Sequence, residues 1–553
     1  MERNLASLAD NRFDLLIVGG GIHGVALAWF ASLAGYSTAL IDRRDFGGQT
    51  SANSQKIIHG GLRHLQRLDF GRVRSSVRER QRLMWLAPHL VHPQRSVLPI
   101  SGHGSKGREA VWAGLGLYNM LTSSLLPLDD PTKKIPAARI LAKDDLADLI
   151  PEMRTSSYLG AAEWHDATCW NTERLVLAFA RGAAIQGATV ANYVGALNLL
   201  KEAGSVQGVE ARDELDGTAF DIRAATTVDC TGPWFGRWWT REESAAKPGA
   251  GSYVSGINLV TERIFEQDVT VSLRTMDESP SGVLVVSPWG TSSIVGTHWM
   301  PFAQEVSEGR ISKERCESLW RQLESAAPGL DLTSTHVRLI HHGLVPAAGS
   351  VGGESGRNWL TQPEIRSHEA EGHGNLFSVR GVKLTTAAAV AESVLKEVFP
   401  GYQASPLEDL PRLPGGDVED WRDFVDRGSR YWKDSELKGD PGSLLQDYGS
   451  EIGAVLALSP DSPAEAAAGS GATQQDGVLA GRVLFAVRHE MAKTLSDVVL
   501  RRTGIGASGF PGIKTLRSVA TLMAGELSWS AGRMEEEIRD VEDFYPSFLR
   551  VAS

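Results

Sequence analysis

The chain of 553 residues carries a formal net charge of -11, and 42% of its residues are hydrophobic. This length allows a large core and about three or four domain-sized units. The acidic balance argues against a nucleic-acid-binding protein, which would present a basic surface.

The cysteines and the apolar runs indicate the cellular compartment of the protein. Cys169, Cys230 and Cys316 are widely separated and form no CxxC pair, which fits a reducing compartment and argues against a disulfide framework or a structural zinc site. We predict no metal site. The first residues lack the pattern of a signal peptide, and no uninterrupted apolar run reaches the roughly 18 residues of a membrane-spanning helix. We therefore expect a cytoplasmic protein.

The first predicted element is a nucleotide-binding unit in "FDLLIVGGGIHGVALAWFASLAGYSTALID". A short apolar strand at 13–18 precedes a glycine turn, a small apolar helix over 25–33 and a second strand that ends at Asp42. In this GxGxxG turn, Gly19 turns the chain, Gly21 admits a pyrophosphate and Gly24 lets the helix pack on the strand. Asp42 can accept hydrogen bonds from ribose hydroxyls. The order of elements indicates dinucleotide binding; the alternative is a glycine-rich turn with a chance aspartate.

Two later segments favour FAD over NAD. The run at 226–229 is typical of a strand, and it ends in the Thr231-Gly232 turn that returns to the dinucleotide in flavoproteins of the glutathione-reductase type. A further strand at 376–379 leads through Gly381 into a helix from about Thr385, which places another helix N-terminus near the flavin. Three separated segments that converge on one dinucleotide are typical of FAD.

The stretch "IIHGGLRH" at 57–64 puts two imidazoles and a guanidinium around two glycines, which a plain loop would not need. It lies within "SANSQKIIHGGLRHL", and the chain also contains "APHLVHP", "NTERLVLAFARGAA", "TGPW", "GVKLTT" and "AVRHEMAKTLSDVVLRRT". With these motifs the chain resembles the FAD-dependent glycerol-3-phosphate dehydrogenases, in the D-amino-acid-oxidase-like branch of flavoproteins. The resemblance runs over most of the sequence.

The resemblance implies an α/β fold with three parts. A glutathione-reductase-type FAD-binding Rossmann domain would comprise residues 1–100, 160–240 and 340–404, and a C-terminal helical domain residues 405–553. A substrate domain would comprise 101–159 and 241–339. Short β-like runs after residue 241 independently suit an antiparallel sheet there, and the pattern from about 405 is helical and more charged.

The resemblance also implies an activity, namely hydride transfer from a secondary alcohol to flavin N5, which yields a ketone. The electrons would pass to a quinone or another acceptor. An oxidase that uses oxygen and a non-catalytic flavin-binding protein are the alternatives. The expected partners are a small hydroxy substrate, anionic or neutral, and the electron acceptor; a homodimer stays open.

The same resemblance assigns the site residues. His59, Arg63 and Lys383 would form the catalytic group, since imidazole can take the hydroxyl proton and the cations can hold anions. A structural imidazole is the alternative for His59, and an ion pair the alternative for Arg63. Substrate contacts would come from Arg63, His64, His341, His342 and Lys383. The residues expected to contact FAD are Gly19, Gly21, Ile22, His23, Gly24, Asp42, Arg43, Ser51, Ser54, Lys56, His59, Gly60, Gly61, Leu62, Thr231, Gly232, Trp234, Gly381, Val382, Lys383, Leu384 and Thr385.

The sequence departs from the family pattern at the substrate end. Where the family has an arginine in "GVRP", this chain has Val345 in "GLVP", and a second family arginine is replaced by Gln362 or the proline after it. His64 and Val382 replace a tyrosine and a glycine of the family. Losing two charge-assisted contacts weakens phosphate binding, so a larger phosphate ester or a sugar or cyclitol derivative is a candidate substrate. The alternative is that drift in spacing hides equivalent arginines.

The segment 108–128 is apolar enough on one side to form an amphipathic helix. In the family the matching region seats the enzyme on a membrane surface, which would place this protein peripherally at the inner face of the membrane. The alternative is an ordinary helix of the substrate domain.

Overall fold

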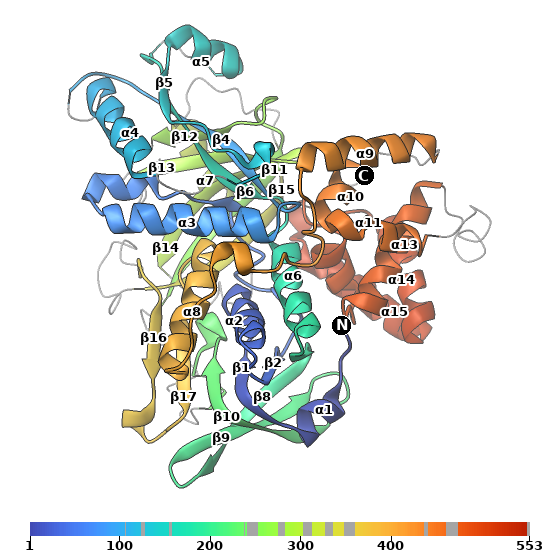
Figure 1. Cartoon of the computed structure of the whole chain (residues 1–553). Coiled ribbons are helices and arrows are strands. Elements are labelled where there is room, and N and C mark those ends of the chain that lie inside the picture. Colours follow the sequence, from blue (N-terminus) through green and yellow to red (C-terminus); the bar gives the residue numbers. More distant parts are fainter. Residues whose placement is uncertain are drawn as a thin grey trace.

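The computed structural model describes residues 1–104, 107–122, 128–153, 157–236, 238–239, 253–274, 282–301, 312–326, 336–347, 360–435, 441–459 and 474–549. They form two β-sheets, helices that cover them, and a group of C-terminal helices. In Figure 1 one sheet occupies the lower part of the molecule and the other the upper part, with the C-terminal helices beside them in orange and red.

The first sheet has the strand order β16-β17-β10-β1-β2-β7, and β8 and β9 continue from β10 as an antiparallel ribbon. These strands are β1 (Arg12–Val18), β2 (Thr38–Ile41), β7 (Thr189–Ala191), β8 (Val194–Glu202), β9 (Ser205–Asp213), β10 (Ala219–Asp229), β16 (Glu364–Ser367) and β17 (Leu376–Arg380). β1 runs parallel to β2 and β10, and β10 runs parallel to β17. Their carboxyl ends therefore meet at one edge of the sheet, where doubly wound folds bind ligands.

Both faces of the first sheet are buried, which explains its uninterrupted apolar strands. Leu15 and Ile17 pack with the helices α2 (Ile22–Leu33), α6 (Thr172–Ile185) and α8 (Ala387–Val398). Leu16 and Val18 point the other way, toward α1 (Leu5–Asp10) and the ribbon. The predicted order of strand, glycine turn, helix and strand is confirmed.

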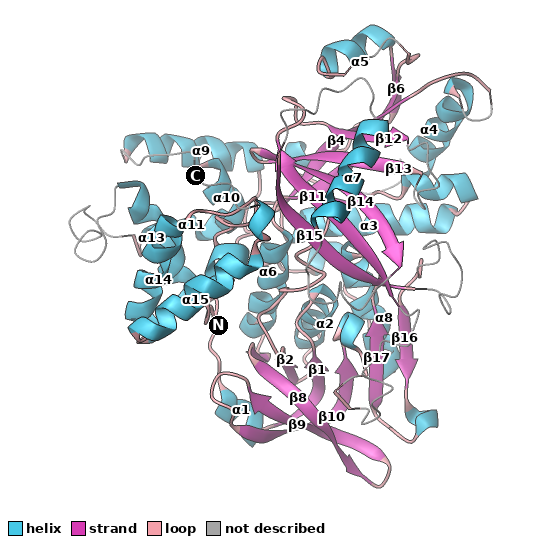
Figure 2. Cartoon of the chain, turned by 180° about the vertical axis from the view of Figure 1, so that it is seen from behind, coloured by secondary structure: helices cyan, strands magenta, loops and turns pink. Residues whose placement is uncertain are grey.

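The second sheet has the order β15-β11-β14-β13-β12-β4-β6-β3, and β5 pairs with β6. Its strands are β3 (Ile57–Ile58), β4 (Val91–Pro99), β5 (Arg139–Leu141), β6 (Ala161–Cys169), β11 (Tyr253–Glu262), β12 (Thr270–Arg274), β13 (Val283–Trp289), β14 (Ser292–Pro301) and β15 (Val337–Pro346). All neighbours are antiparallel except β4 and β12. Side chains such as Val97, Val271 and Leu323 form a core between one face and α7 (Lys313–Ala326), which lies on that face in Figure 2.

The strand pairing differs from the predicted domain boundaries. β4 and β6 fall inside the ranges 1–100 and 160–240 that the sequence assigned to the FAD-binding domain, yet they pair with each other in the second sheet. β15 crosses the predicted boundary at 340 and pairs along its length with β11. The reason is that partner choice depends on long-range pairing, which short runs of β-like residues do not encode. The substrate-side sheet is therefore assembled from strands that are far apart in the chain, from β3 at residue 57 to β15 at residue 346.

Between β3 and β6 the chain forms η1 (Leu62–Arg67), α3 (Phe70–Leu86), α4 (Arg108–Thr122) and α5 (Lys143–Leu149). The C-terminal region consists of α9 (Trp421–Asp434), α10 (Gly442–Tyr448), α11 (Ile452–Leu456), α13 (Gln474–His489), the π-helix η9 (Asp497–Arg502), α14 (Ile513–Leu527) and α15 (Ala531–Phe544). A hydrophobic core joins α13, η9, α14 and α15 to Val260, Ile294 and Leu339 of the second sheet. The predicted helical C-terminal domain is confirmed.

Buried ion pairs join the same helices to the first sheet. Asp45, in the loop after β2, accepts two hydrogen bonds from Arg502 at 2.6 and 2.8 Å and one from Arg501 at 2.6 Å. Arg174 of α6 donates to both oxygens of Glu490 at 2.8 and 2.9 Å. The arginines hold the pKa of Asp45 well below its usual range although burial alone would raise it. The C-terminal helices therefore fix the position of the loop after β2.

We predict that Arg502→Met strongly destabilises the protein, because it leaves the buried Asp45 with one arginine instead of two. Breaking a buried pair costs about 3–5 kcal/mol. The midpoint of thermal unfolding measured by calorimetry should fall clearly. The matched control is Arg517→Met, which breaks the exposed pair of Arg517 with Glu535 and should change stability by about 1 kcal/mol or less. Equal midpoints for the two variants would contradict the prediction.

Candidate functional site

A cavity of about 1810 Å3 lies between the carboxyl edge of the first sheet and one face of the second sheet. Its lower wall comes from the ends of β1, β2, β10 and β17, and from the segment 47–66 that leads through β3 into η1. Its upper wall comes from β4, β6, β11, β12, β13, β14 and β15. Residues from all three predicted dinucleotide segments therefore face one space.

The turn between β1 and α2 is so tight at Gly19 and Gly24 that only glycine fits at these two positions. Gly19 has a φ of +110°, and a Cβ there would lie 2.6 Å from the Cys230 carbonyl oxygen. A Cβ on Gly24 would lie 1.9 Å from the Gly19 oxygen, so α2 packs directly on the strand. At Gly21 the space is open, since a Cβ would meet only the Ser51 hydroxyl at 3.4 Å. The backbone at this helix start is thus accessible to a phosphate group.

Asp42 directly follows β2 and its carboxylate holds the glycine turn by hydrogen bonds. Its carboxylate accepts hydrogen bonds from the backbone N–H groups of Gly20 at 2.6 Å and Arg44 at 2.7 Å. Burial raises the pKa of Asp42 to about 6 despite these two bonds. The side chain lines the cavity, so its remaining lone pairs can accept hydrogen bonds from ribose hydroxyls.

Two buried polar atoms on the wall support a dinucleotide ligand. Nε2 of His23 and Nε2 of Gln55 have no hydrogen-bond partner among the described residues, and both side chains line the cavity. Burial lowers the pKa of His23 to about 4, so this imidazole is neutral. Unpaired buried polar atoms cost free energy unless a ligand pairs with them. The residues present therefore fit FAD, which carries many polar groups along its length.

Most of the predicted cofactor residues line the cavity, and three have other roles. Gly24 supports helix packing, as described above. Gly60 lies behind the wall, where a Cβ would meet Arg80 at 2.4 Å. Lys56 reaches the cavity, but its ammonium donates to Glu173 at 2.7 and 2.9 Å and to Thr172, so the charge is used in a buried ion pair. The predicted residues that line the cavity are Gly19, Gly21, Ile22, His23, Asp42, Arg43, Ser51, Ser54, Lys56, His59, Gly61, Leu62, Thr231, Gly232, Trp234, Gly381, Val382, Lys383, Leu384 and Thr385.

His341 and His342 were expected at the substrate, and neither is among the cavity-lining residues. His341 is buried against Trp289, with 5.9 Å between the ring centres. His342 shares a hydrogen bond of 3.2 Å with Ser255. Of the residues in β15, only 343–346 at its C-terminal end line the cavity. Val345 is one of these residues, and Gln362 is not.

His59 forms a pair with an aspartate that the sequence did not single out for this role. Nδ1 of His59 lies 3.2 Å from Oδ2 of Asp166, which also accepts from the Trp164 indole at 3.2 Å. Oδ1 of Asp166 accepts from the Gly60 N–H at 2.6 Å. Burial would raise the pKa of Asp166, but the hydrogen bond and charge of His59, with Arg80 and Gly60, lower it overall. The carboxylate is therefore charged and fixes the orientation of the imidazole.

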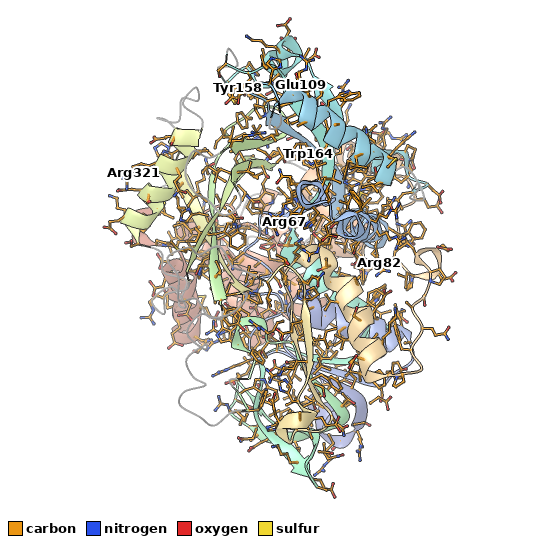
Figure 3. The ribbon with its side chains drawn as sticks, turned by 90° about the vertical axis from the view of Figure 1, so that its left-hand side faces the viewer. Arg67, Arg82, Glu109, Tyr158, Trp164 and Arg321 are labelled. Carbon is orange, nitrogen blue, oxygen red and sulfur yellow. The ribbon has the colours of Figure 1, made fainter. Side chains whose placement is uncertain are left out.

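One feature of the sequence could have indicated that Asp166 faces the cavity, namely its position on β6 two residues after Trp164. Ala162, Trp164 and Asp166 follow one another at every second residue and all line the cavity. Such a pattern places them on one face of the strand, but it does not reveal which histidine they meet. In Figure 3 Trp164 and Arg67 lie on one side of the second sheet and Arg321 of α7 on the other side.

Positive groups gather at the same end of the cavity. Arg63, His64 and Lys383 all line it, and Nζ of Lys383 lies 3.3 Å from Nε2 of His64. Burial and the charge of Arg63 lower the pKa of Lys383 to about 8, and burial and Lys383 lower the pKa of His64 to about 4. Arg63 makes no hydrogen bond or ion pair with the described residues. This cluster can hold an anion.

No group of three or more His, Cys, Asp or Glu side chains suited to a metal ion occurs in the part of the chain that the structure describes. Within the same described ranges, no helix is long and apolar enough to cross a membrane.

Comparisons with known proteins agree with this geometry. The family model described as FAD dependent oxidoreductase matches residues 14–395, and the model described as the C-terminal domain of alpha-glycerophosphate oxidase matches residues 412–534. The chain is 27% identical to a glycerol-3-phosphate dehydrogenase of Synechocystis, over 98% of both chains. It is 29% identical to glycerol-3-phosphate dehydrogenase 2 of Mycobacterium tuberculosis, over 96% of this chain and 88% of that one.

A solved structure shows the same fold. The glycerol-3-phosphate dehydrogenase of Bacillus halodurans, complexed with FAD, superimposes with a TM-score of 0.74 over 98% of this chain and 95% of that chain, at 22% identity. The match over residues 14–395, together with the glycine turn, Asp42 and the returning strands, shows that this chain belongs to the FAD-dependent oxidoreductase family.

Proposed function

We propose that this protein oxidises a secondary alcohol of a small anionic hydroxy compound to a ketone, with His59 as the base. The observation that carries the proposal is the shared cavity, in which the His59–Asp166 pair and the cluster of Arg63 and Lys383 lie beside the FAD cradle. The chemistry that FAD supplies when bound is the acceptance of two electrons from the alcohol carbon. Residues of this chain bind the substrate, orient it and take its hydroxyl proton.

His59 is suited to take the hydroxyl proton. With Nδ1 engaged by Asp166, the other ring nitrogen carries the lone pair that accepts it, and the side chain is half-exposed toward the cavity. Asp166 stabilises the imidazolium that forms, since it remains charged. Arg63 and Lys383 hold the anionic group of the substrate and so orient the alcohol carbon.

The substrate is expected to differ from glycerol 3-phosphate. Val345 lines the cavity where the family pattern has an arginine, and Gln362 is exposed outside it. A larger phosphate ester or a sugar or cyclitol derivative suits this arrangement. The names of the relatives in Synechocystis and Mycobacterium tuberculosis favour glycerol 3-phosphate itself as the second candidate.

The electron acceptor is proposed to be a quinone, with an oxygen-using oxidase as the alternative. Anaerobic reduction of the protein followed by mixing with air or with a soluble quinone separates these two. Rapid return of the yellow colour in air would favour the oxidase.

Peripheral attachment to the inner face of a membrane is supported by α4. Trp112, Gly116 and Met120 are exposed and one helical turn apart, so they form one stripe, with Trp112 71% and Met120 65% exposed. Leu68, which is 68% exposed, follows η1, and η1 contacts α4. An exposed stripe of this kind suits the interface of a membrane. The predicted helix spanned 108–128; its part at 123–127 lies outside the described residues.

We predict that His59→Gln keeps FAD bound but slows reduction of the flavin by substrate at least tenfold, because general-base catalysis typically contributes a hundredfold or more. Stopped-flow absorbance under anaerobic conditions measures the rate. His103→Gln is the matched control, since His103 pairs with Glu109 on the surface and should leave the rate unchanged. An unchanged rate in His59→Gln would assign this imidazole a structural role.

We predict that anion binding weakens as the pH rises through about 8. The Lys383 amine is charged below its pKa of about 8 and neutral above it, so its attraction for an anion is complete at low pH and lost at high pH. The dissociation constant of sulfate, followed by its effect on the flavin absorbance from pH 7 to 9.5, should increase above pH 8. Lys383→Arg keeps the charge and should remove this increase. A sulfate affinity independent of pH in the unmodified protein would contradict the assignment.

We predict that glycerol 3-phosphate reduces the flavin poorly and binds weakly. Val345→Arg should raise kcat/KM for this compound by about tenfold to a hundredfold, the range of one charge-assisted contact of about 1.5–3 kcal/mol. Because a buried guanidinium can destabilise a fold, FAD content and the unfolding midpoint must be shown to be retained. Efficient turnover of glycerol 3-phosphate by the unmodified protein, with a KM in the micromolar range, would show that other groups hold the phosphate.

A further inference from the structure

We infer that the substrate is a polyhydroxylated anion with several hydroxyl groups beyond the reacting carbon, which bind a row of hydroxyl side chains on β4 and β12. The inference rests on the proposed alcohol oxidation and names the class of substrate. The row consists of Ser96, Thr270 and Ser272. None of these residues belongs to the motifs by which the chain resembles its family.

The register of the second sheet places these hydroxyls on the wall of the cavity. Ser96 of β4 pairs with Thr270 of β12, and Ser272 follows two residues later on the same face. Val271, between Thr270 and Ser272, and Val97, next to Ser96, point into the hydrophobic core beneath α7. Along β12 polar and apolar residues alternate, so Thr270 and Ser272 share the cavity face while Val271 and Leu273 share the core face. This part of the wall therefore presents three hydroxyls, beside the apolar side chains of Leu98, Val283 and Val285.

The hydroxyls are buried and largely unpaired. Thr270 is 2% exposed, and its Oγ1 has no hydrogen-bond partner among the described residues. Ser272 is buried and also has none there, while Ser96 makes one long hydrogen bond of 3.5 Å to the Gln94 oxygen. A buried hydroxyl without a partner costs free energy, which a ligand hydroxyl can offset because it both donates and accepts.

Spacing argues for a ligand longer than glycerol 3-phosphate. Residues two apart on a strand are separated by about 7 Å, and adjacent strands by about 5 Å. The two hydroxyls of glycerol 3-phosphate are on neighbouring carbons, so they do not reach both Thr270 and Ser272 while one of them is at His59. A chain or ring of five or six carbons with a hydroxyl on most of them does.

The neighbouring wall also suits a polyol. Oδ1 of Asn258 accepts from the Thr297 hydroxyl at 2.9 Å, which leaves the amide N–H groups of Asn258 without a partner among the described residues. Trp164 and Trp299 line the cavity as well, and aromatic faces pack against the C–H groups of polyols. Asp166 is the acid on this wall, and Arg63 and Lys383 are available for the anionic end.

The test uses the complete FAD-loaded protein. It compares short and long compounds that carry the same anionic group. Glycerate is paired with gluconate, and glycerol 3-phosphate with sorbitol 6-phosphate. Anaerobic stopped-flow absorbance gives the second-order rate constant for flavin reduction, and the flavin absorbance gives the dissociation constants. At least one long compound should react tenfold or more faster than its short partner; which pair does so identifies the anionic group.

Thr270→Val and Ser272→Ala should each lower the rate constant of the long compound by about three- to tenfold, the fold-change of one neutral hydrogen bond. They should change the short compound by less than twofold. Ser287→Ala is the matched control, because Ser287 is another buried, unpartnered hydroxyl of the second sheet that is not among the cavity-lining residues. This control should leave both rate constants unchanged.

Two results would overturn the inference. If short compounds react as well as long ones and neither Thr270→Val nor Ser272→Ala separates them, the polyol class is wrong while alcohol oxidation stands. If no compound binds or reacts, both ideas are wrong. If a long compound binds, and binds more weakly to Thr270→Val, but does not reduce the flavin, polyol recognition is supported and the proposed oxidation fails.

Discussion

The close contact between α2 and the two central strands is the constraint on which the site depends. A Cβ on Gly24 would come within 1.9 Å of the Gly19 oxygen, and a Cβ on Gly19 within 2.6 Å of the Cys230 oxygen. Because these glycines have no side chain, β1, β10 and the start of α2 meet at one point. The helix N-terminus, Asp42 and the Thr231-Gly232 turn then face the same space, which gives a dinucleotide its cradle.

Two parts of the molecule outside the first sheet complete this cradle. The C-terminal helices reach back through Arg501 and Arg502 to Asp45, so the loop that carries the ribose end of the site is held by a buried ion pair. The second sheet forms the opposite wall. Alternation along β12 sends Val271 and Leu273 toward α7 and Thr270 and Ser272 toward the cavity, and β6 adds Asp166 to the same wall.

Charge is unevenly distributed around the cavity, and this distribution determines the chemistry we propose. His59 is held by a charged carboxylate, whereas Arg63 and Lys383 have no carboxylate partner among the described residues. Burial, with the nearby charge of Arg63, lowers the pKa of Lys383, so the cluster is stabilised when an anion binds. The His59–Asp166 pair therefore suits proton removal, and the neighbouring cluster of Arg63 and Lys383 suits an anionic substrate.

The sequence by itself determined the local units. The strand, glycine turn and helix at the N-terminus, the Thr231-Gly232 turn and the Gly381 loop were predicted because each depends on neighbouring residues, and nearly all the predicted cofactor residues line the cavity. Only the tertiary structure decided which units meet. Asp166 reaches His59 across 107 residues and Arg502 reaches Asp45 across 457, while His341 and His342 pack away from the site and β4 and β6 join the second sheet. The physical reason is that strand pairing and ion pairing over such separations are set by packing of the whole chain, which local patterns do not encode.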